Sequence, residues 1–301
     1  MSITMTAAAR AFLDRNRLTT DYLTTANQWF EPLIEGFCDQ YDAQRPPVVL
    51  GINGCQGSGK STLADYLCCM IAERLDIATI ALSLDDFYLT RAERAELAKS
   101  VHPLLATRGV PGTHDVALAI DCLDNLRAGN NTVITRFDKK IDDRAVDLEI
   151  NSQPVGLIVL EGWCLGAQPQ PELALSTPIN SLEQVEDPEG IWRNYVNRTL
   201  RGDYQRLFAS IDQMIMLQAP SFETVHQWRV EQERKMIDSV LEQGLDAPPE
   251  AMNDEQIQRF IQHFQRITEE ILRELPDRVD HLFKLDYQRR INSYSQPSKS
   301  A

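Results

Sequence analysis

The sequence has no apolar run long enough to cross a membrane, and basic residues are scarce beside acidic ones. Lysine and arginine number 30 against 44 aspartates and glutamates, a formal net charge of −14 at pH 7. This balance argues against nucleic acid or an anionic membrane as the main partner, although a local group of cations would still bind an anionic substrate. The N-terminus also lacks a basic segment followed by an apolar one, so we expect no secretory signal and a cytoplasmic location.

The six cysteines form no regular framework, and none of their spacings is typical of a zinc site. Cys68 and Cys69 are adjacent on an expected helix, and Cys55 lies inside a glycine-rich stretch. We interpret most of them as buried thiols of a reducing compartment. Cys55 carries a second hypothesis: a helix N-terminus lowers a thiol pKa, so oxidation there would couple to loss of nucleotide binding.

The stretch Val48–Thr62 carries the pattern G-x-x-x-x-G-K-S, which is typical of a phosphate-binding loop. An apolar, β-branched strand is predicted before it, and apolar spacing over residues 61–73 predicts a helix after it. The glycines let backbone N–H groups face the phosphates, Lys60 would pair with the terminal phosphates, and the Ser61 hydroxyl would ligate Mg²⁺. The predicted nucleotide contacts are Gly54, Cys55, Gln56, Gly57, Ser58, Gly59, Lys60, Ser61 and Thr62.

Acidic residues follow two further predicted strands. Residues 78–83 form a buried strand followed by Asp85 and Asp86, and residues 155–160 form another followed by Glu161. Carboxylates at the carboxyl ends of parallel strands lie where substrates bind in open α/β sheets. Asp85 would accept the proton of an attacking hydroxyl or help to hold Mg²⁺, and Glu161 would steer Mg²⁺ through its waters. Helix capping is the alternative for the two aspartates.

Two loops carry further candidate contacts to a substrate. The loop 108–115 combines a rigid glycine and proline turn with Arg, His and Asp. The charged segment 138–144 would bind a carboxylate or phosphate through Lys139 and Arg144. The alternatives are helix capping for Thr113 and Asp115, a structural role for His114, and a solvated hairpin for the segment 138–144. The candidate substrate contacts are Asp86, Tyr88, Arg108, Thr113, His114, Asp115, Lys139 and Arg144.

The rest of the chain predicts more helices and strands around this centre. Residues 5–40 are expected to be a helical extension, and residues 191–208 a basic helix. The arginines of that helix, Arg198 and Arg201 among them, would cover the transferring phosphoryl as a lid, with a solvated helix as the alternative. Further expected elements are strands at 132–137, 212–218 and 279–285 and helices at 91–99, 116–127, 222–241 and 253–275.

Six blocks, in order, match one known family. They are Asn53–Thr62, Leu84–Thr90, Arg108–Asp115, Phe137–Lys139, Leu160–Trp163 and Trp228–Glu233. Together they resemble the D-glycerate 3-kinase family, which belongs with the P-loop kinases related to phosphoribulokinase, uridine kinase and pantothenate kinase. The resemblance covers about residues 30–290, and the blocks D-D-F-Y-L-T and R-G-V-P-G-T-H-D are its specific parts.

The resemblance implies Mg²⁺-dependent transfer of the γ-phosphoryl of ATP to the 3-hydroxyl of D-glycerate. It implies a P-loop NTPase fold of the α/β class, with a mostly parallel sheet and helices on both faces. We expect an N-terminal helical extension (1–45), a kinase domain (46–292) with a lid at about 188–209, and a disordered tail (293–301). The catalytic residues would be Lys60, Asp85, Arg198 and Arg201, and the metal would lie near Ser61, Asp85 and Glu161.

The sequence departs from the family pattern in two places. Cys55 stands where members usually have proline, and only four residues separate Lys139 from Arg144 where members have a longer glycine-containing loop. This loop lies near the expected acceptor site, so the acceptor stays open, with a nucleoside, pantothenate or a sugar phosphate as alternatives. A nucleotide-dependent switch that hydrolyses ATP without an acceptor is the alternative from another class. The oligomeric state also stays open.

Overall fold

The computed structural model describes residues 5–241 and 252–297. A six-stranded sheet crosses this described part, in the order β10-β9-β8-β1-β7-β2. Its first five strands along the chain are mutually parallel, and the last pairs antiparallel at one edge. The strands are β1 (Val48–Gly54), β2 (Thr79–Ser83), β7 (Leu157–Gly162), β8 (Gln213–Gln218), β9 (His281–Leu285) and β10 (Ile291–Ser295). The predicted mostly parallel α/β sheet is confirmed.

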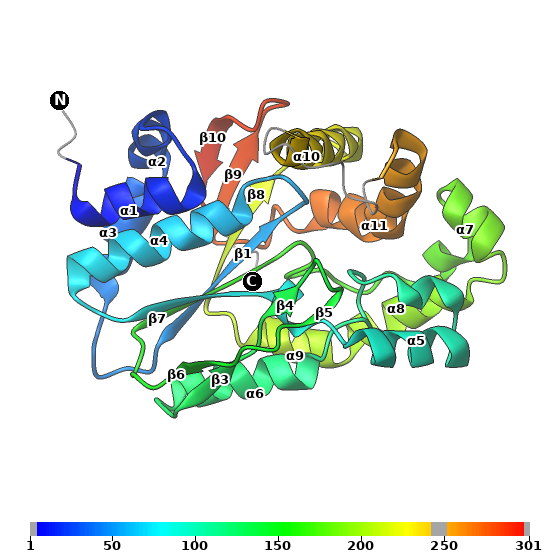
Figure 1. The fold of residues 1–301 in the computed structure, drawn as a ribbon, viewed down its shortest axis with the longest axis horizontal. Helices are drawn as coiled ribbons and strands as arrows, with labels where there is room; N and C mark the ends of the chain where they lie inside the picture. The colour runs from blue at the N-terminus through cyan, green and yellow to red at the C-terminus, as the bar shows by residue number, and fades with distance from the viewer. Residues whose placement is uncertain (1–4, 242–251, 298–301) are drawn as a thin grey trace.

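Helices cover both faces of the sheet (Figure 1). One face packs against α1 (Ala7–Asn16), α2 (Asp21–Trp29), α3 (Glu31–Gln40) and α4 (Lys60–Leu75). The other packs against α6 (Val116–Arg127), α8 (Ile191–Arg201), α9 (Asp203–Ala209) and α11 (Asp254–Glu274). The remaining helices are α5 (Arg91–Ser100), α7 (Ser181–Glu186), α10 (Phe222–Leu241) and the 3₁₀ turns η1 (Leu84–Phe87), η2 (Pro103–Ala106) and η3 (Glu172–Ser176).

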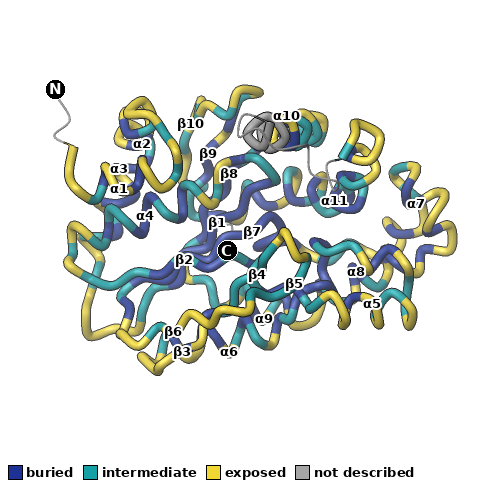
Figure 2. Tube along the Cα trace, in the orientation of Figure 1, coloured by how far each residue is buried: buried dark blue, intermediate teal, exposed yellow. Residues whose placement is uncertain are grey.

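The central strands are buried on both sides because their side chains feed two separate cores. In β7, Leu157 and Val159 point to the core beneath α1–α4, whereas Ile158 and Leu160 point to the core beneath α6, α9 and α11. This is the period-2 geometry of a strand, and burial on both faces explains why the sequence is continuously apolar. Figure 2 shows the buried sheet between more exposed outer helices.

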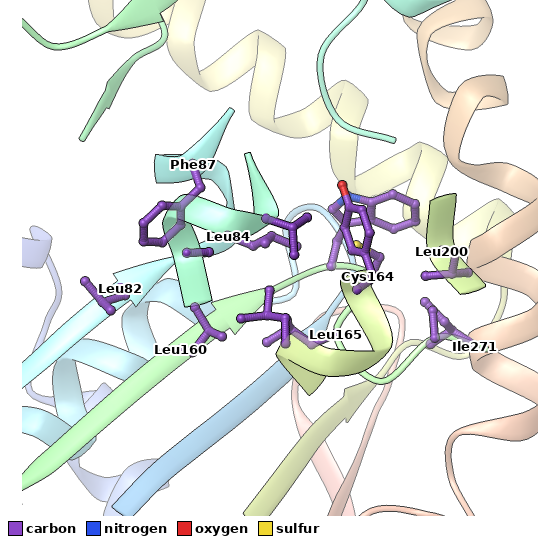
Figure 3. Close-up of a cluster of buried hydrophobic side chains, with 14 of the residues drawn as sticks. Leu82, Leu84, Phe87, Leu160, Cys164, Leu165, Leu200 and Ile271 are labelled. Atoms are coloured by element: carbon purple, nitrogen blue, oxygen red, sulfur yellow. The ribbon is translucent and has the colours of Figure 1, made fainter. Parts of the chain in front are cut away.

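The second core continues to the ends of the strands. Figure 3 shows part of this core, with Leu82 of β2 and Leu160 of β7 in one cluster with Leu84 and Cys164, which follow these strands. All four are essentially inaccessible to solvent. The polar residues near the carboxyl ends of these two strands are therefore supported by a densely packed apolar core. None of the helices within the described ranges is long and apolar enough to cross a membrane.

The predicted elements are largely confirmed, with three corrections. The single strand predicted at 132–137 is two short ones, β3 (Thr132–Ile134) and β4 (Phe137–Asp138), because Arg136 turns aside to bind Asp86 and Glu149. These strands pair outside the central sheet, with β6 (Glu149–Asn151) and β5 (Asp143–Arg144) respectively.

The other two corrections concern a helix and the C-terminal segment. The helix predicted at 191–208 is divided at Gly202 into α8 and α9, since the backbone of this glycine is not helical. The disordered tail predicted from residue 293 is wrong for residues 293–295, which belong to β10. There Tyr294 stacks on Phe283 of β9 at 4.7 Å between ring centroids. Residues 298–301 lie outside the described residues.

Candidate active site

A pocket of about 320 Å³ lies where β1, β2 and β7 end. Segments that follow these strands form one wall, and α10 and α11 contribute the opposite one. Carboxyl ends of parallel strands are the usual ligand position in open α/β sheets. Ten of the predicted site residues line this pocket: Gln56, Gly57, Gly59, Lys60, Ser61, Thr62, Asp85, Tyr88, Arg108 and Lys139.

The phosphate-binding loop takes a backbone form that depends on glycine. Gly57 and Gly59 have φ values of +77° and +92°, in the left-handed region that side chains rarely adopt. A Cβ on Gly57 would also lie 3.1 Å from Cβ of Trp228, a fully buried residue of α10. The loop is therefore pressed against α10, and its last residues open α4, whose N-terminus presents backbone N–H groups to an anion.

The end of this loop meets an acidic residue from β7. The Ser61 hydroxyl donates a 2.6 Å hydrogen bond to Oε1 of Glu161, and Lys60 Nζ lies 3.6 Å from Oε2. Glu161 is buried, and its Oε2 has no hydrogen-bond partner. Burial lowers the pKa of Lys60, but the negative charges of Glu161 and Asp85 raise it by more. The pKa of Lys60 therefore lies above its ordinary value. The ammonium is therefore charged at neutral pH.

These groups fit Mg²⁺. Mg²⁺ prefers oxygen ligands, and in phosphoryl-transfer sites it is held by one or two protein oxygens together with the substrate phosphates. The Ser61 hydroxyl and Oε2 of Glu161, which accepts no hydrogen bond, are such oxygens. In the described part of the chain, no group of three or more His, Cys, Asp and Glu side chains would form a metal cage by itself. The arrangement suits an ion that arrives with a nucleotide.

Asp85 faces the same pocket from η1. Its Oδ2 lies 2.7 Å from Lys139 Nζ, and its Oδ1 accepts a 2.8 Å hydrogen bond from the Tyr88 hydroxyl. Burial raises the pKa of this carboxyl, but Lys139, Lys60 and the two hydrogen bonds lower it more strongly, to well below the usual range. Asp85 is thus a carboxylate paired with the ammonium of Lys139 in the charged segment 138–144, and the charge of Lys60 in the same pocket also favours its ionised form.

The wall opposite the phosphate-binding loop was largely missed by sequence reasoning. Arg229 and Gln232 reach the pocket from α10, and Phe260 and Phe264 from α11. Arg229 and Gln232 lie in the block Trp228–Glu233 that carries part of the family resemblance, whereas the two phenylalanines belong to an amphipathic stripe typical of an ordinary core. Phe264 packs edge-on against Trp163, with ring centroids 5.1 Å apart. Sequence periodicity alone does not distinguish Phe260 and Phe264 from core residues, so it could not have assigned them to the pocket.

Four side chains that were predicted to contact the substrate form hydrogen bonds or ion pairs within the protein instead. Asp86 pairs with Arg136 and caps η1, and the Thr113 hydroxyl bonds within its own loop. Asp115 caps α6 and forms a 3.0 Å ion pair with Arg144. None of these side chains lines the pocket described above. For Asp86, Thr113 and Asp115 the capping and loop alternatives account for the observed contacts, and Arg144 anchors its segment to α6.

His114 lies just behind the pocket. Its ring stacks on Tyr88 with centroids 4.6 Å apart, and its Nδ1 is 2.6 Å from the Tyr204 hydroxyl. Burial lowers the pKa of His114 to about 4, so the ring is neutral at pH 7. This geometry supports a structural histidine that fixes the Tyr88 ring, and it leaves direct substrate contact a prediction.

The two arginines predicted to be catalytic are not brought to the pocket. Arg198 lies over the Tyr195 ring of its own helix, and Arg201 is exposed, 3.9 Å from Glu172. A third arginine of α8, Arg193, is buried in an ion pair with Asp187. The basic character of this helix is thus explained by local partners, and the catalytic role of Arg198 and Arg201 stays a prediction.

Comparison with known proteins identifies the family, although no protein-family model matches the sequence. An uncharacterized kinase from Schizosaccharomyces pombe is 34% identical over 231 residues, which cover 72% of this chain and 78% of that protein. The chloroplastic D-glycerate 3-kinase of Arabidopsis thaliana is 31% identical over 236 residues, 73% of this chain and 46% of that protein. The solved D-glycerate 3-kinase of Cryptococcus neoformans superposes with a TM-score of 0.70 at 25% identity, covering 87% of this chain and 94% of that one.

This chain belongs to the D-glycerate 3-kinase family. It is therefore a P-loop kinase, as its sequence blocks predict.

The surroundings of Cys55, one of the positions where the sequence departs from the family pattern, differ from the expectation of a lowered thiol pKa. The thiol is buried inside the phosphate-binding loop, and burial raises its pKa to about 12 even though Lys60 opposes this. The helix N-terminus was expected to lower that pKa. A thiol that stays protonated is a poor target for oxidation, so the structure contradicts the basis of the redox hypothesis for this kinase.

Proposed function

We propose that this kinase transfers the γ-phosphoryl of ATP to the 3-hydroxyl of D-glycerate. The observation that carries the proposal is the position of Asp85, whose carboxylate is near both Lys60 and Lys139 in one pocket. A phosphate-binding cation, a carboxylate for the attacking hydroxyl and cations for an anionic acceptor thus share one space. The Arabidopsis and Cryptococcus relatives are D-glycerate 3-kinases by name, which supports D-glycerate as the acceptor.

In the proposed reaction each residue has a defined part. The glycine-rich loop and Lys60 hold the β- and γ-phosphates, and Ser61 with Glu161 would hold Mg²⁺, which would supply positive charge to the phosphates during the transfer. Asp85 orients the acceptor hydroxyl. The hydroxyl oxygen bonds to the γ-phosphorus as the bond to the bridging oxygen breaks; ADP leaves, and the hydroxyl proton passes to Asp85.

The lowered pKa of Asp85 is compatible with this part. The transition state of phosphoryl transfer is loose in most analyses, so the hydroxyl proton becomes acidic late and a strong base is not needed. A carboxylate that stays ionised holds the hydroxyl in line with the phosphorus at every physiological pH. The aromatic wall of Trp163, Phe260 and Phe264 would exclude water from the transfer.

We also propose the domain division expected from the sequence. Residues 46–292 would form the kinase domain, and residues 1–45 a helical extension whose α1–α3 pack on α4 through the core they share. The segment 188–209 would be the lid. Trp192, Val196 and Leu200 of this segment belong to the same buried cluster as Phe264 of the pocket wall, which connects the two through the core.

The test is ATP-to-ADP turnover with Mg²⁺, with D-glycerate, L-glycerate, uridine, pantothenate, ribulose 5-phosphate or no acceptor. Selective stimulation by D-glycerate, with 3-phosphoglycerate as the product, is the expected result. Stimulation by another acceptor would leave the kinase assignment intact and show that D-glycerate is not the substrate. Hydrolysis at the same rate with and without every acceptor would instead favour an ATPase switch.

A further inference from the structure

A buried arginine joins three segments beneath the acceptor side of the pocket. Arg94 of α5 is 2% exposed, and it donates to the backbone oxygens of Leu89 at 3.1 Å, Ala106 at 3.0 Å and Asp142 at 2.7 Å. Its Nη2 is also 2.9 Å from the Asp142 carboxylate. A buried guanidinium is tolerated only when its donors are satisfied, so these contacts fix the segments relative to one another.

Asp142 links this buried arginine to a residue of the pocket. One of its carboxylate oxygens pairs with Arg94, and the other accepts from Nη1 of Arg108. Its backbone has φ +55°, an uncommon value for a residue other than glycine, and the bond from Arg94 to its carbonyl holds it there. The direction of Arg108 thus depends on an aspartate that Arg94 keeps in place.

The charges of this group do not cancel. Two guanidinium groups share one carboxylate, which leaves one positive charge in excess. Arg94 is enclosed, whereas Arg108 is partly exposed and lines the pocket that also holds Asp85. Arg108 also lies over the Phe137 ring, 5.5 Å from its centroid, so its plane is restricted on a second side. The excess charge is therefore presented to the pocket by a guanidinium of fixed direction.

We propose that Asp142 is a positioning residue that aims Arg108 at the carboxylate of the acceptor, and that Arg94 keeps Asp142 from neutralising Arg108 fully. A planar guanidinium held in one direction binds a carboxylate through two parallel hydrogen bonds, which gives specificity as well as attraction. The group selects hydroxy acids over neutral alcohols of the same size. This inference rests on the proposed kinase activity and names the acceptor class of the same site.

The test compares D-glycerate with glycerol, its neutral analogue, in wild type, Asp142→Asn and the control Asp147→Asn, an exposed position nearby. For Asp142→Asn we expect KM for D-glycerate to rise about tenfold, because a hydrogen bond to a charged group is lost from the Arg108 anchor. KM for ATP should stay within twofold, and the preference for D-glycerate over glycerol in kcat/KM should fall about tenfold. Asp147→Asn should change none of these values.

Several results would overturn the proposal. One is an unchanged or lower KM for D-glycerate in Asp142→Asn; another is a parallel loss for both acceptors, which a merely structural role would give. If Asp142→Asn does not fold, Arg108→Met must abolish the preference for D-glycerate while KM for ATP holds, or the proposal fails.

The two proposals can be separated. A wild-type kinase that uses pantothenate and not D-glycerate removes the proposed substrate, yet supports a carboxylate site if Asp142→Asn raises KM for pantothenate. A kinase stimulated only by uridine, or by none of these compounds, overturns both.

Discussion

The two sides of the pocket are built by different physical means. On the phosphate side, the backbone forms the site: a buried strand, glycines in the left-handed region and a helix N-terminus, with Trp228 packed behind them. On the acceptor side, ion pairs between distant segments form it, such as Lys139 with Asp85 and Arg108 with Asp142. Backbone geometry constrains the first side to one ligand chemistry, whereas exchanging charged side chains would retune the second without disturbing the sheet.

The largest expected effect is on the phosphate side. Lys60→Ala should lower turnover about 10⁴-fold, because a buried ammonium that meets the transferring phosphates is lost while Glu161 keeps its charge. Lys140→Ala, at an exposed position of the charged segment, is the matched control and should retain activity. Steady-state ATP turnover measures both, and thermal melts check that each variant is folded. Residual turnover within tenfold of wild type in Lys60→Ala would contradict the proposed phosphate site.

Adjacent aspartates test the point where the two sides meet. Asp85→Asn should lower kcat about 10³-fold with little change in the affinity for ATP, since a carboxylate that orients the hydroxyl is lost. Asp86→Asn should lower the melting temperature, because Asp86 pairs with Arg136 and caps η1, and it should leave kcat within tenfold. Equal losses of kcat and of ATP affinity in Asp85→Asn would count against its role toward the acceptor.

The pH profile supplies a second measurement on Asp85. Its pKa is lowered in the folded protein, so the carboxylate stays ionised as pH falls from 7 to 5. Any stability that its ion pairs supply is lost only when the pH falls below the ordinary pKa of an aspartate toward the lowered pKa of the folded state. This group should therefore leave kcat constant over that interval. A fall in kcat with an apparent pKa above 5 that disappears in Asp85→Asn would contradict the assignment.

A smaller effect is expected from the brace behind the phosphate-binding loop. Arg289 donates its Nε to the carbonyl of Gly57 at 2.8 Å, and its guanidinium lies over the Trp228 ring, 5.0 Å from the centroid. Arg289→Met should raise KM for ATP about tenfold, because a charge-assisted bond to the loop is lost. Arg290→Met is the control, since Arg290 is exposed and pairs with Asp286. A shift in KM for the acceptor instead of ATP would break the division between the two sides.

The difference between the two sides also explains what the sequence could predict. The phosphate side is encoded in one continuous stretch, Val48–Thr62, where strand, glycines and helix follow at fixed spacing. The acidic residues Asp85 and Glu161 were predictable because each stands at or just beyond the carboxyl end of a strand whose apolar sequence is visible, Glu161 near the end of β7 and Asp85 two residues after β2. Such signals depend on neighbours in the chain, which a sequence displays directly.

On the acceptor side, Tyr88, Arg108 and Lys139 were predicted, but the contacts that hold them could not be, because these contacts join segments far apart in the chain. Arg94 sits on a short charged helix and looks solvated, yet it is buried beneath Asp142. Phe260 and Phe264 share the spacing of core residues, and only the packing of α11 turns them toward the pocket. The strand β10 was missed for the same reason, since its polar sequence becomes a strand by pairing with β9.

The smallest expected effect concerns the helix predicted to be a lid. Arg201 is exposed and lies 3.9 Å from Glu172, and a surface ion pair of this kind contributes about 1 kcal/mol or less. Arg201→Met should therefore keep kcat within twofold of wild type, whereas Arg108→Met, at the pocket, should raise KM for the acceptor. If Arg201→Met instead lowers kcat by a hundredfold with KM unchanged, the arginine must reach the phosphates during turnover. That result would support the catalytic role predicted from the sequence, and α8 would have to move toward the phosphate-binding loop as the kinase closes.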